Sequence, residues 1–186
     1  MPLLPPQRDL FPADLLDQRG EDWQGLTRWV AFYTLARREK ELMRKLVAKG
    51  IPFYAPLVKR RHRSPAGRVR ESFVPLFPGY VFSRVDDDQR RSALATKAVA
   101  RWLPIGDDDA LRDDLRSIKR LIDADVPLTP EARLASGQRV RVRGGPLRDM
   151  EGTVIERRGR RRLVVAVRFL NQGASVELDE VELERT

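Results

Sequence analysis

The spacing of hydrophobic residues changes along the chain. Residues 29–34 are apolar on both faces, which predicts a central β-strand. From residue 37 to 49 the apolar positions recur every three or four residues, which predicts an amphipathic helix that stops at Gly50. Residues 138–143 alternate between polar and apolar side chains, as half-buried strands do. A mixed α/β segment is therefore followed by an all-β segment, and we expect an α+β protein.

The same patterns predict the remaining elements. Strands are expected at 53–58, 80–85 and 99–104, with helices at 89–97 and from about 107 to 122. The order strand, helix, strand, strand, helix, strand favours a ferredoxin-like α/β sandwich. Further strands are expected at 138–143, 152–156, 163–169, 174–178 and 181–183. Several short strands in about fifty residues predict a small five-stranded β-barrel.

Two Asp triplets, 86–88 and 107–109, precede predicted helices. Carboxylates at a helix start accept hydrogen bonds from free backbone N–H groups and favour the positive end of the dipole. We interpret both triplets as helix caps, although acidic clusters also occur in metal and acid–base sites. We expect no metal site and no catalytic residue.

The patterns divide the chain into four parts. Residues 1–27 contain four prolines and show weak periodicity, which predicts a mostly disordered arm. Residues 28–123 form the first predicted domain, 124–136 a linker and 137–186 the second domain. The N-terminus lacks a basic segment followed by an apolar core, so we expect no signal peptide.

The densest group of aromatic residues lies at 73–85, where prolines and a glycine separate the rings. Pro78 fixes its own φ and Gly79 tolerates a positive φ, so the pair predicts a turn before the strand at 80–85. Aromatic rings between rigid prolines favour an exposed apolar surface for a partner. Ordinary core packing is the alternative interpretation.

The charge is concentrated in one segment. The chain has a formal net charge of +9, and residues 28–104 hold 18 Lys and Arg against 6 Asp and Glu. Such a concentration favours a polyanionic partner, while a solvated basic surface is the alternative. The chain has no Cys and one His, which argues against a thiol enzyme or a Cys-ligated metal. The lack of Cys suits a reducing cytoplasm, and no stretch is long enough for a membrane span.

Two segments resemble one protein family in the order in which that family has them. Residues 137–158, GQRVRVRGGPLRDMEGTVIERR, resemble a KOW domain, and residues 77–81, FPGYV, with Trp29 resemble the N-terminal domain of bacterial NusG. Tyr33 and the Ala55–Pro56 pair are nearer to the specialised RfaH-type paralogues. The basic segment 59–70 departs from the paralogues, and the clean alternation after residue 137 gives no case for an all-helical alternative state.

The resemblance implies a transcription elongation or antitermination factor that uses no cofactor and acts as a monomer. Its N-terminal domain would bind the clamp helices of the RNA polymerase β′ subunit and hold the clamp closed, which suppresses pausing or termination. The side chains implied in this contact are Tyr33, Tyr54, Phe77, Pro78, Tyr80 and Phe82.

Nucleic acid and a second protein complete the implied partners. The basic residues expected to contact the non-template DNA strand or nascent RNA are Arg37, Arg38, Lys40, Arg44, Arg61, Arg63 and Arg68. The KOW domain would recruit Rho or a small-subunit ribosomal protein through Met150 and Leu170. An RNA-binding or ribosome-associated KOW protein, with its arginine-rich tip at 157–162 on RNA, is the alternative function. An enzyme is a third and weaker one.

Overall fold

The computed structural model describes residues 7–18, 26–63, 65, 67–178 and 183–186. The chain divides into two compact units, Met1–Asp109 and Ala110–Thr186. The sequence placed the end of the first domain at residue 123. The division at 109 instead assigns most of the third helix to the second unit.

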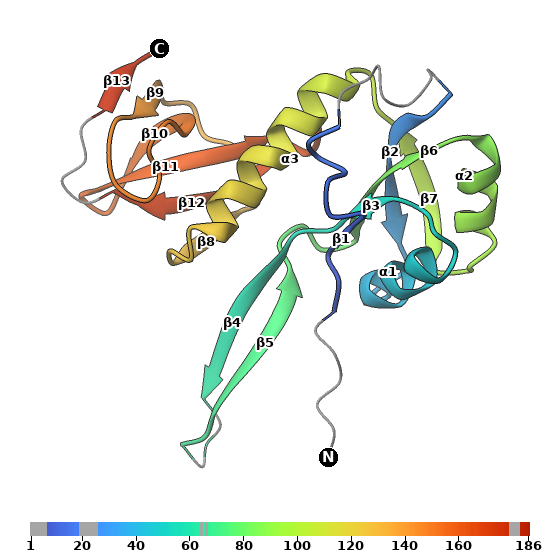
Figure 1. Ribbon diagram of the computed structural model, residues 1–186. Coiled ribbons are helices and arrows are strands. Elements are labelled where there is room, and N and C mark those ends of the chain that lie inside the picture. Colours follow the sequence, from blue (N-terminus) through green and yellow to red (C-terminus); the bar gives the residue numbers. More distant parts are fainter. Residues whose placement is uncertain (1–6, 19–25, 64, 66, 179–182) are drawn as a thin grey trace. The chain divides into compact units, whose positions relative to one another are not determined.

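The first unit contains a five-stranded antiparallel sheet in the order β1-β3-β6-β2-β7 (Figure 1). Its strands are β1 (Leu10–Phe11), β2 (Arg28–Thr34), β3 (Phe53–Tyr54), β6 (Tyr80–Val85) and β7 (Val99–Pro104). Helix α1 (Glu39–Ala48) connects β2 to β3, and α2 (Asp87–Leu94) connects β6 to β7. The predicted order of strands and helices is therefore present, and the mixed α/β character is confirmed.

Both helices cover one face of this sheet. Val30 and Phe32 of β2 pack in one cluster with Leu42 and Leu46 of α1, and Ala93 of α2 belongs to the same cluster. Burying such side chains stabilises the fold by about 1.5–3 kcal/mol for each large residue. This cluster explains why the apolar positions of α1 recur at helical spacing.

The predicted cap at the first Asp triplet is confirmed. The Asp86 side chain accepts a hydrogen bond from Gln89 N at 2.7 Å, and the Gln89 side chain accepts one from Asp86 N at 3.2 Å. The two bonds form a capping box that starts α2. In the second triplet, Asp108 lies in the first turn of α3 (Asp108–Asp123) and accepts from Trp29 N at 3.2 Å. Burial raises the pKa of the Asp108 carboxyl.

The N-terminal arm differs from the predicted disorder over residues 9–16. Strand β1 pairs with β3, with Leu10 opposite Tyr54, and Ala55 N donates to Asp9 O at 2.8 Å. Leu15 and Leu16 are buried. The arm therefore supplies the edge strand of the sheet and two core side chains. The rest of the predicted disorder, at 1–6 and 19–25, lies outside the described residues.

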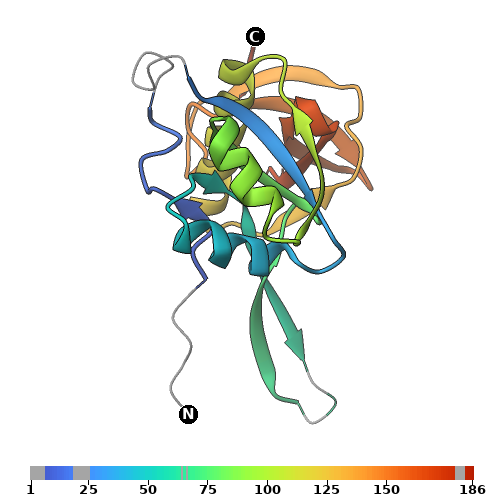
Figure 2. The same ribbon diagram turned by 90° about the vertical axis from the view of Figure 1, so that its right-hand side faces the viewer.

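Residues 57–75 form a separate two-stranded hairpin. Strands β4 (Leu57–Arg63) and β5 (Val69–Pro75) pair with each other, and the hairpin projects away from the five-stranded sheet in both views (Figures 1 and 2). The sequence predicted one strand at 53–58, followed by a basic loop or hairpin tip at 59–70, and the structure has a hairpin with longer strands than expected. Pro56 has no N–H for a ladder, so pairing in the main sheet ends at Tyr54 and a new ladder starts at Leu57.

The second unit contains a six-stranded antiparallel sheet in the order β13-β9-β10-β11-β12-β8. Its strands are β8 (Leu128–Glu131), β9 (Gln138–Val142), β10 (Glu151–Arg157), β11 (Arg160–Val167), β12 (Gln172–Glu177) and β13 (Leu183–Arg185). The prediction of five strands missed β8, which lies in the expected linker and pairs with β12. A 3₁₀ turn, η2 (Arg168–Leu170), replaces the end of the strand expected at 163–169. Of the strand expected at 181–183, residues 181 and 182 lie outside the described part.

Helix α3 is hydrogen-bonded to two segments of the second unit, the 3₁₀ turn η2 and the connection between β9 and β10. The Asp114 carboxylate accepts from Arg168 N at 2.9 Å and from Arg168 Nε at 3.1 Å. Arg120 also donates to Arg148 O at 3.1 Å. These bonds explain why the contacts assign most of α3 to the second unit. No helix in the described part of the chain is both long and apolar enough to cross a membrane.

Candidate functional site

The second face of the five-stranded sheet, opposite α1 and α2, brings predicted contact residues together. Tyr33 is paired with Tyr80, and Phe82 is paired with both Ala31 and Tyr54. Directly paired residues share a face of a sheet, and so do residues two apart in a strand. The register therefore places Tyr33, Tyr54, Tyr80 and Phe82 on one face.

Two tyrosines at one end of this face form a cluster with an arginine. The rings of Tyr33 and Tyr80 meet edge to face, with centroids 5.2 Å apart. The Arg101 guanidinium lies 5.1 Å from the centroid of the Tyr33 ring. Both contacts are attractive in themselves, because a ring has a negative face and a positive edge. Both tyrosines are half-buried, so part of each ring remains at the surface.

A tight turn beside these tyrosines is held from two sides. Gly79 has φ +86°, as the Pro78–Gly79 pair predicted. Thr34 N donates to Gly79 O at 2.8 Å, and Gly79 N donates to the buried Glu39 carboxylate at 2.8 Å. The turn is therefore bonded to both β2 and α1. Pro78, at its apex, is exposed.

We call Tyr33, Pro78 and Tyr80 the aromatic rim. The other three predicted contact residues, Tyr54, Phe77 and Phe82, are at most 1% exposed. Phe77 packs edge to face on Phe82 at 6.2 Å. These three side chains are packed in the core, which is the alternative interpretation given above. The prediction that they contact a partner directly is therefore wrong for this structure.

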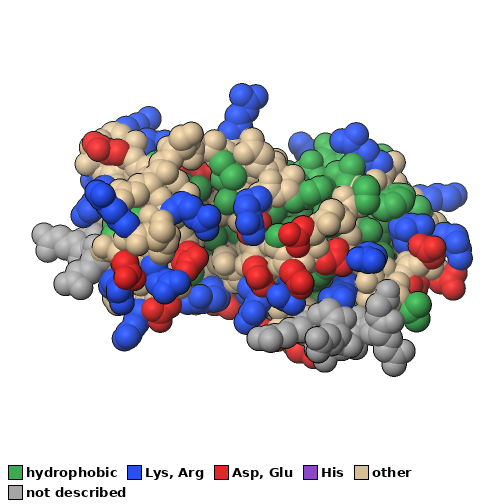
Figure 3. Space-filling model, turned by 90° about the horizontal axis from the view of Figure 1, so that it is seen from above, with side chains coloured by type: hydrophobic (Ala, Val, Ile, Leu, Met, Phe, Trp, Pro, Cys, Tyr) green, Lys and Arg blue, Asp and Glu red, His purple; other side chains and the backbone are tan. Residues whose placement is uncertain are grey.

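The predicted nucleic-acid contacts lie on two elements. Arg37, Arg38 and Arg44 are exposed at or on α1, and Lys40 is half-buried. Arg38 lies 3.7 Å from Glu41, and Arg44 donates to Gln7 of the arm at 3.1 Å. On the face seen in Figure 3, Lys and Arg side chains are interspersed with Asp and Glu.

The hairpin holds the second group, Arg61, Arg63 and Arg68, all exposed. Residues 57–75 contain six Lys and Arg and one acid, Glu71. Glu71 lies 2.9 Å from Lys59 and 3.0 Å from Arg61. The hydrogen bond from Lys59, followed by that from Arg61, lowers the pKa of the Glu71 carboxyl.

Two exposed apolar side chains accompany these cations. Phe73 is 51% exposed and Val69 is 59% exposed. In the hairpin register Phe73 is opposite Lys59 and Val69 is opposite Arg63, so each apolar side chain shares a face with a cation. The sequence analysis did not identify Val69 as exposed. Its exposure follows from the hairpin having only two strands, β4 and β5, among the described residues.

The predicted contacts of the second unit are partly changed. Met150 is 2% exposed, so it packs inside the unit, and the expectation that it contacts a partner is wrong. Leu170 in η2 is half-buried, and its neighbour Phe169 is 39% exposed. Phe169 was missed because the sequence placed it in a regular strand.

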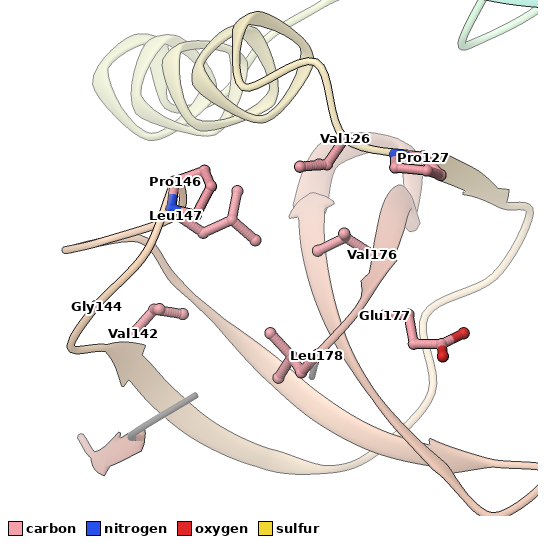
Figure 4. Close-up of a pocket in the computed structure, with 9 residues that line it drawn as sticks. All are labelled: Val126, Pro127, Val142, Gly144, Pro146, Leu147, Val176, Glu177 and Leu178. Carbon is pink, nitrogen blue, oxygen red and sulfur yellow. The ribbon is translucent and has the colours of Figure 1, made fainter. Parts of the chain in front are cut away.

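The second unit also contains an apolar hollow of about 390 Å³. Val126, Val142, Leu147, Val176 and Leu178 point into it from both sides, while the Glu177 carboxylate points away (Figure 4). Pro127, Gly144 and Pro146 complete its lining.

A model of one protein family, described as transcription termination factor nusG, matches residues 27–139. The match covers more than half of the chain and includes four of the five strands of the first unit's sheet, all but β1, together with the hairpin and α3. The chain belongs to the NusG family. The resemblance to NusG-like factors is therefore confirmed, and a role in transcription follows from it. None of the curated proteins that were searched matches the chain.

Proposed function

We propose that this NusG-family chain is an elongation factor that binds RNA polymerase through the aromatic rim and suppresses pausing or termination. The observation that carries the proposal is the clustering of Tyr33, Pro78 and Tyr80 within a segment that matches the family. Retention of core RNA polymerase by the immobilised full chain tests it. The chain would resemble the specialised RfaH-type members of the family.

The rim suits a contact with a pair of helices, such as the clamp helices of the β′ subunit. Aromatic anchors on a rigid base lose little conformational freedom on binding, and they dominate many interfaces. The hydrogen bonds from Thr34 and Gly79 hold the turn in place before any partner arrives. Binding that favours the closed clamp would shift the polymerase away from paused states without any chemical step.

The hairpin cations extend the proposal to nucleic acid at the upstream fork. Arg61, Arg63 and Arg68 project from the unit on a two-stranded ribbon, where strand phosphates can reach them. Each contact with a single strand should lower the logarithm of affinity by about 0.7 per tenfold rise in salt. The cations of α1 would add to this contact if the strand follows the unit from the hairpin to that helix.

The second unit would act as a KOW domain that recruits Rho or a small-subunit ribosomal protein. The candidate contact residues are Phe169, which is exposed, and Leu170, which is half-buried, both in η2. Joined in one chain to a polymerase-bound unit, it would meet its partner at a raised effective concentration.

Glu71→Gln is expected to tighten binding of single-stranded DNA by the full chain. The substitution releases Lys59 and Arg61 from their only described acidic partner on the hairpin, so both become available to phosphates. Affinity should rise by about 3- to 10-fold at 0.15 M salt. The salt slope, which is the slope of log affinity against log salt concentration, should become steeper by up to about 1.4, or about 0.7 for each cation released. Fluorescence anisotropy with a labelled oligonucleotide measures both quantities.

Glu151→Gln is the matched control for this variant. It removes the same charge and releases Arg141, which donates to Glu151 at 3.1 Å on the second unit. The proposal expects a smaller gain from this control than from Glu71→Gln. Equal gains from both would show that only net charge matters, and the hairpin would lose its assigned role.

A further inference from the structure

The tip of the β10–β11 hairpin presents several arginines on a rigid turn. Arg157 pairs with Arg160, which leaves a two-residue connection, Arg158 and Gly159, with φ of 54° and 73°. Two consecutive positive φ values are typical of the type I′ turn, which matches the twist of its strands. The position of the arginines is therefore fixed by the backbone.

A hollow of about 580 Å³ lies beside this tip. Its lining comes from β8, β12 and both strands of the hairpin. The residues are Thr129, Arg157, Arg158, Arg160, Arg162 and Glu177. Thr129 lies on β8, the strand found where the sequence predicted a linker. The hollow is thus complete only because β8 joins the sheet.

Two of the guanidinium groups are oriented by groups behind them. Arg157 donates to both oxygens of Glu131, at 3.3 and 3.2 Å, and Glu131 is 6% exposed. Arg162 donates to Ser175 Oγ at 3.0 Å and to Thr129 Oγ1 at 2.7 Å. Ser175 in turn donates to Glu131 at 2.5 Å. The network fixes Arg157 and Arg162 before a ligand binds, which lowers the entropy lost on binding.

The lining has an excess of positive charge. It holds four arginines and one carboxylate, that of Glu177, which pairs with Arg160 and lies 3.8 Å from Arg162. Arg158 forms no ion pair with any residue in the described part of the chain. Planar guanidinium groups match the geometry of phosphate oxygens and bind them through paired hydrogen bonds.

We propose that this hollow binds the phosphodiester backbone of a single nucleic-acid strand. The hollow is polar and open on one side, which suits a chain of phosphates that passes through better than an enclosed small anion. The inference goes beyond the proposed function, which places the nucleic-acid contacts on the first unit. RNA and DNA share this backbone, and the test below separates them.

The test uses the full chain with Arg61, Arg63 and Arg68 replaced by alanine, so that the hairpin β4–β5 contributes little. In this background, Arg158→Gln with Arg160→Gln is compared with the parent for binding of labelled 12-nucleotide RNA and DNA of one sequence. Loss of two phosphate contacts should weaken binding about 10-fold at 0.15 M salt and reduce the salt slope by about 1.4.

The matched control is Arg161→Gln with Arg139→Gln in the same background. Arg161 is on the same hairpin, but its side chain lies on the opposite face of the sheet from Arg160 and Arg162, and its partner in the strand register is Glu156. Arg139 lies on β9. The control should change affinity by about 2-fold or less, because neither side chain lines the hollow and salt screens exposed charges outside it. An effect on RNA alone would assign the hollow to RNA through its 2′-hydroxyls, and equal effects would assign it to the shared backbone.

Equal losses in the test and control variants, or no loss in either, would overturn the inference. Neither variant alters the aromatic rim. Polymerase binding measured in parallel therefore reports on the proposed function separately, whatever happens at the hollow.

Discussion

Replacing Tyr33 and Tyr80 together by alanine is expected to weaken binding of the full chain to core RNA polymerase by about 100-fold or more. Central aromatic anchors typically contribute about 2 kcal/mol or more each, and about 1.4 kcal/mol corresponds to a tenfold change. The two rings touch and form most of the aromatic rim. Biolayer interferometry with immobilised polymerase measures the change.

The control for this variant is the pair Tyr33→Phe and Tyr80→Phe. It keeps both rings and their edge-to-face contact, and it removes only the hydroxyl groups. We expect binding within a few-fold of the unsubstituted chain. A folded alanine variant that binds polymerase as tightly as the parent would exclude the aromatic rim as the contact surface.

Gly79→Ala should lower the free energy of unfolding of the first unit by about 2–3 kcal/mol. An alanine at φ +86° is strained by the backbone alone, and its Cβ would lie 2.9 Å from Tyr33 Cε2. The ring or the turn must then move, which also strains the hydrogen bond from Gly79 N to Glu39. Urea unfolding followed by tryptophan fluorescence reports on this unit, because all three tryptophans precede residue 110.

Gly50→Ala separates the two causes. Gly50 also has a positive φ, +64°, but a Cβ there meets no atom within 4 Å. We expect a loss of about 1 kcal/mol from backbone strain alone. If the two variants lose the same free energy, contact with Tyr33 adds nothing, and the close packing of the turn against the rim is not significant.

The sequence predicted those elements that local patterns determine. Strands β6 and β7 have the predicted bounds, and the capping box at Asp86 starts α2 as expected. Strands β1 and β8 were missed because each is short and has no clear alternation of its own. They form because β3 and β12 offer free edges, and residues far away in the chain provide those edges.

The candidate site was also predictable only where local sequence patterns determine it. Strand periodicity determines that Tyr80 and Phe82 share a face, but the register between β2 and β6 decides that Tyr33 joins them. Neither determines which of these side chains stays at the surface. Exposure depends on what packs above each ring, and that information is not local. The contact of Arg101 with Tyr33 depends on the register between β2 and β7, and no sequence motif marks it.

The most direct test of the proposed role is a single-round transcription assay on a template with a strong pause and a terminator. Saturating full chain should shorten the half-life of the paused complex or raise read-through of the terminator, and the Tyr33→Ala, Tyr80→Ala variant should do neither at the same concentration. An unchanged half-life and unchanged read-through with the unsubstituted chain would contradict a role in elongation.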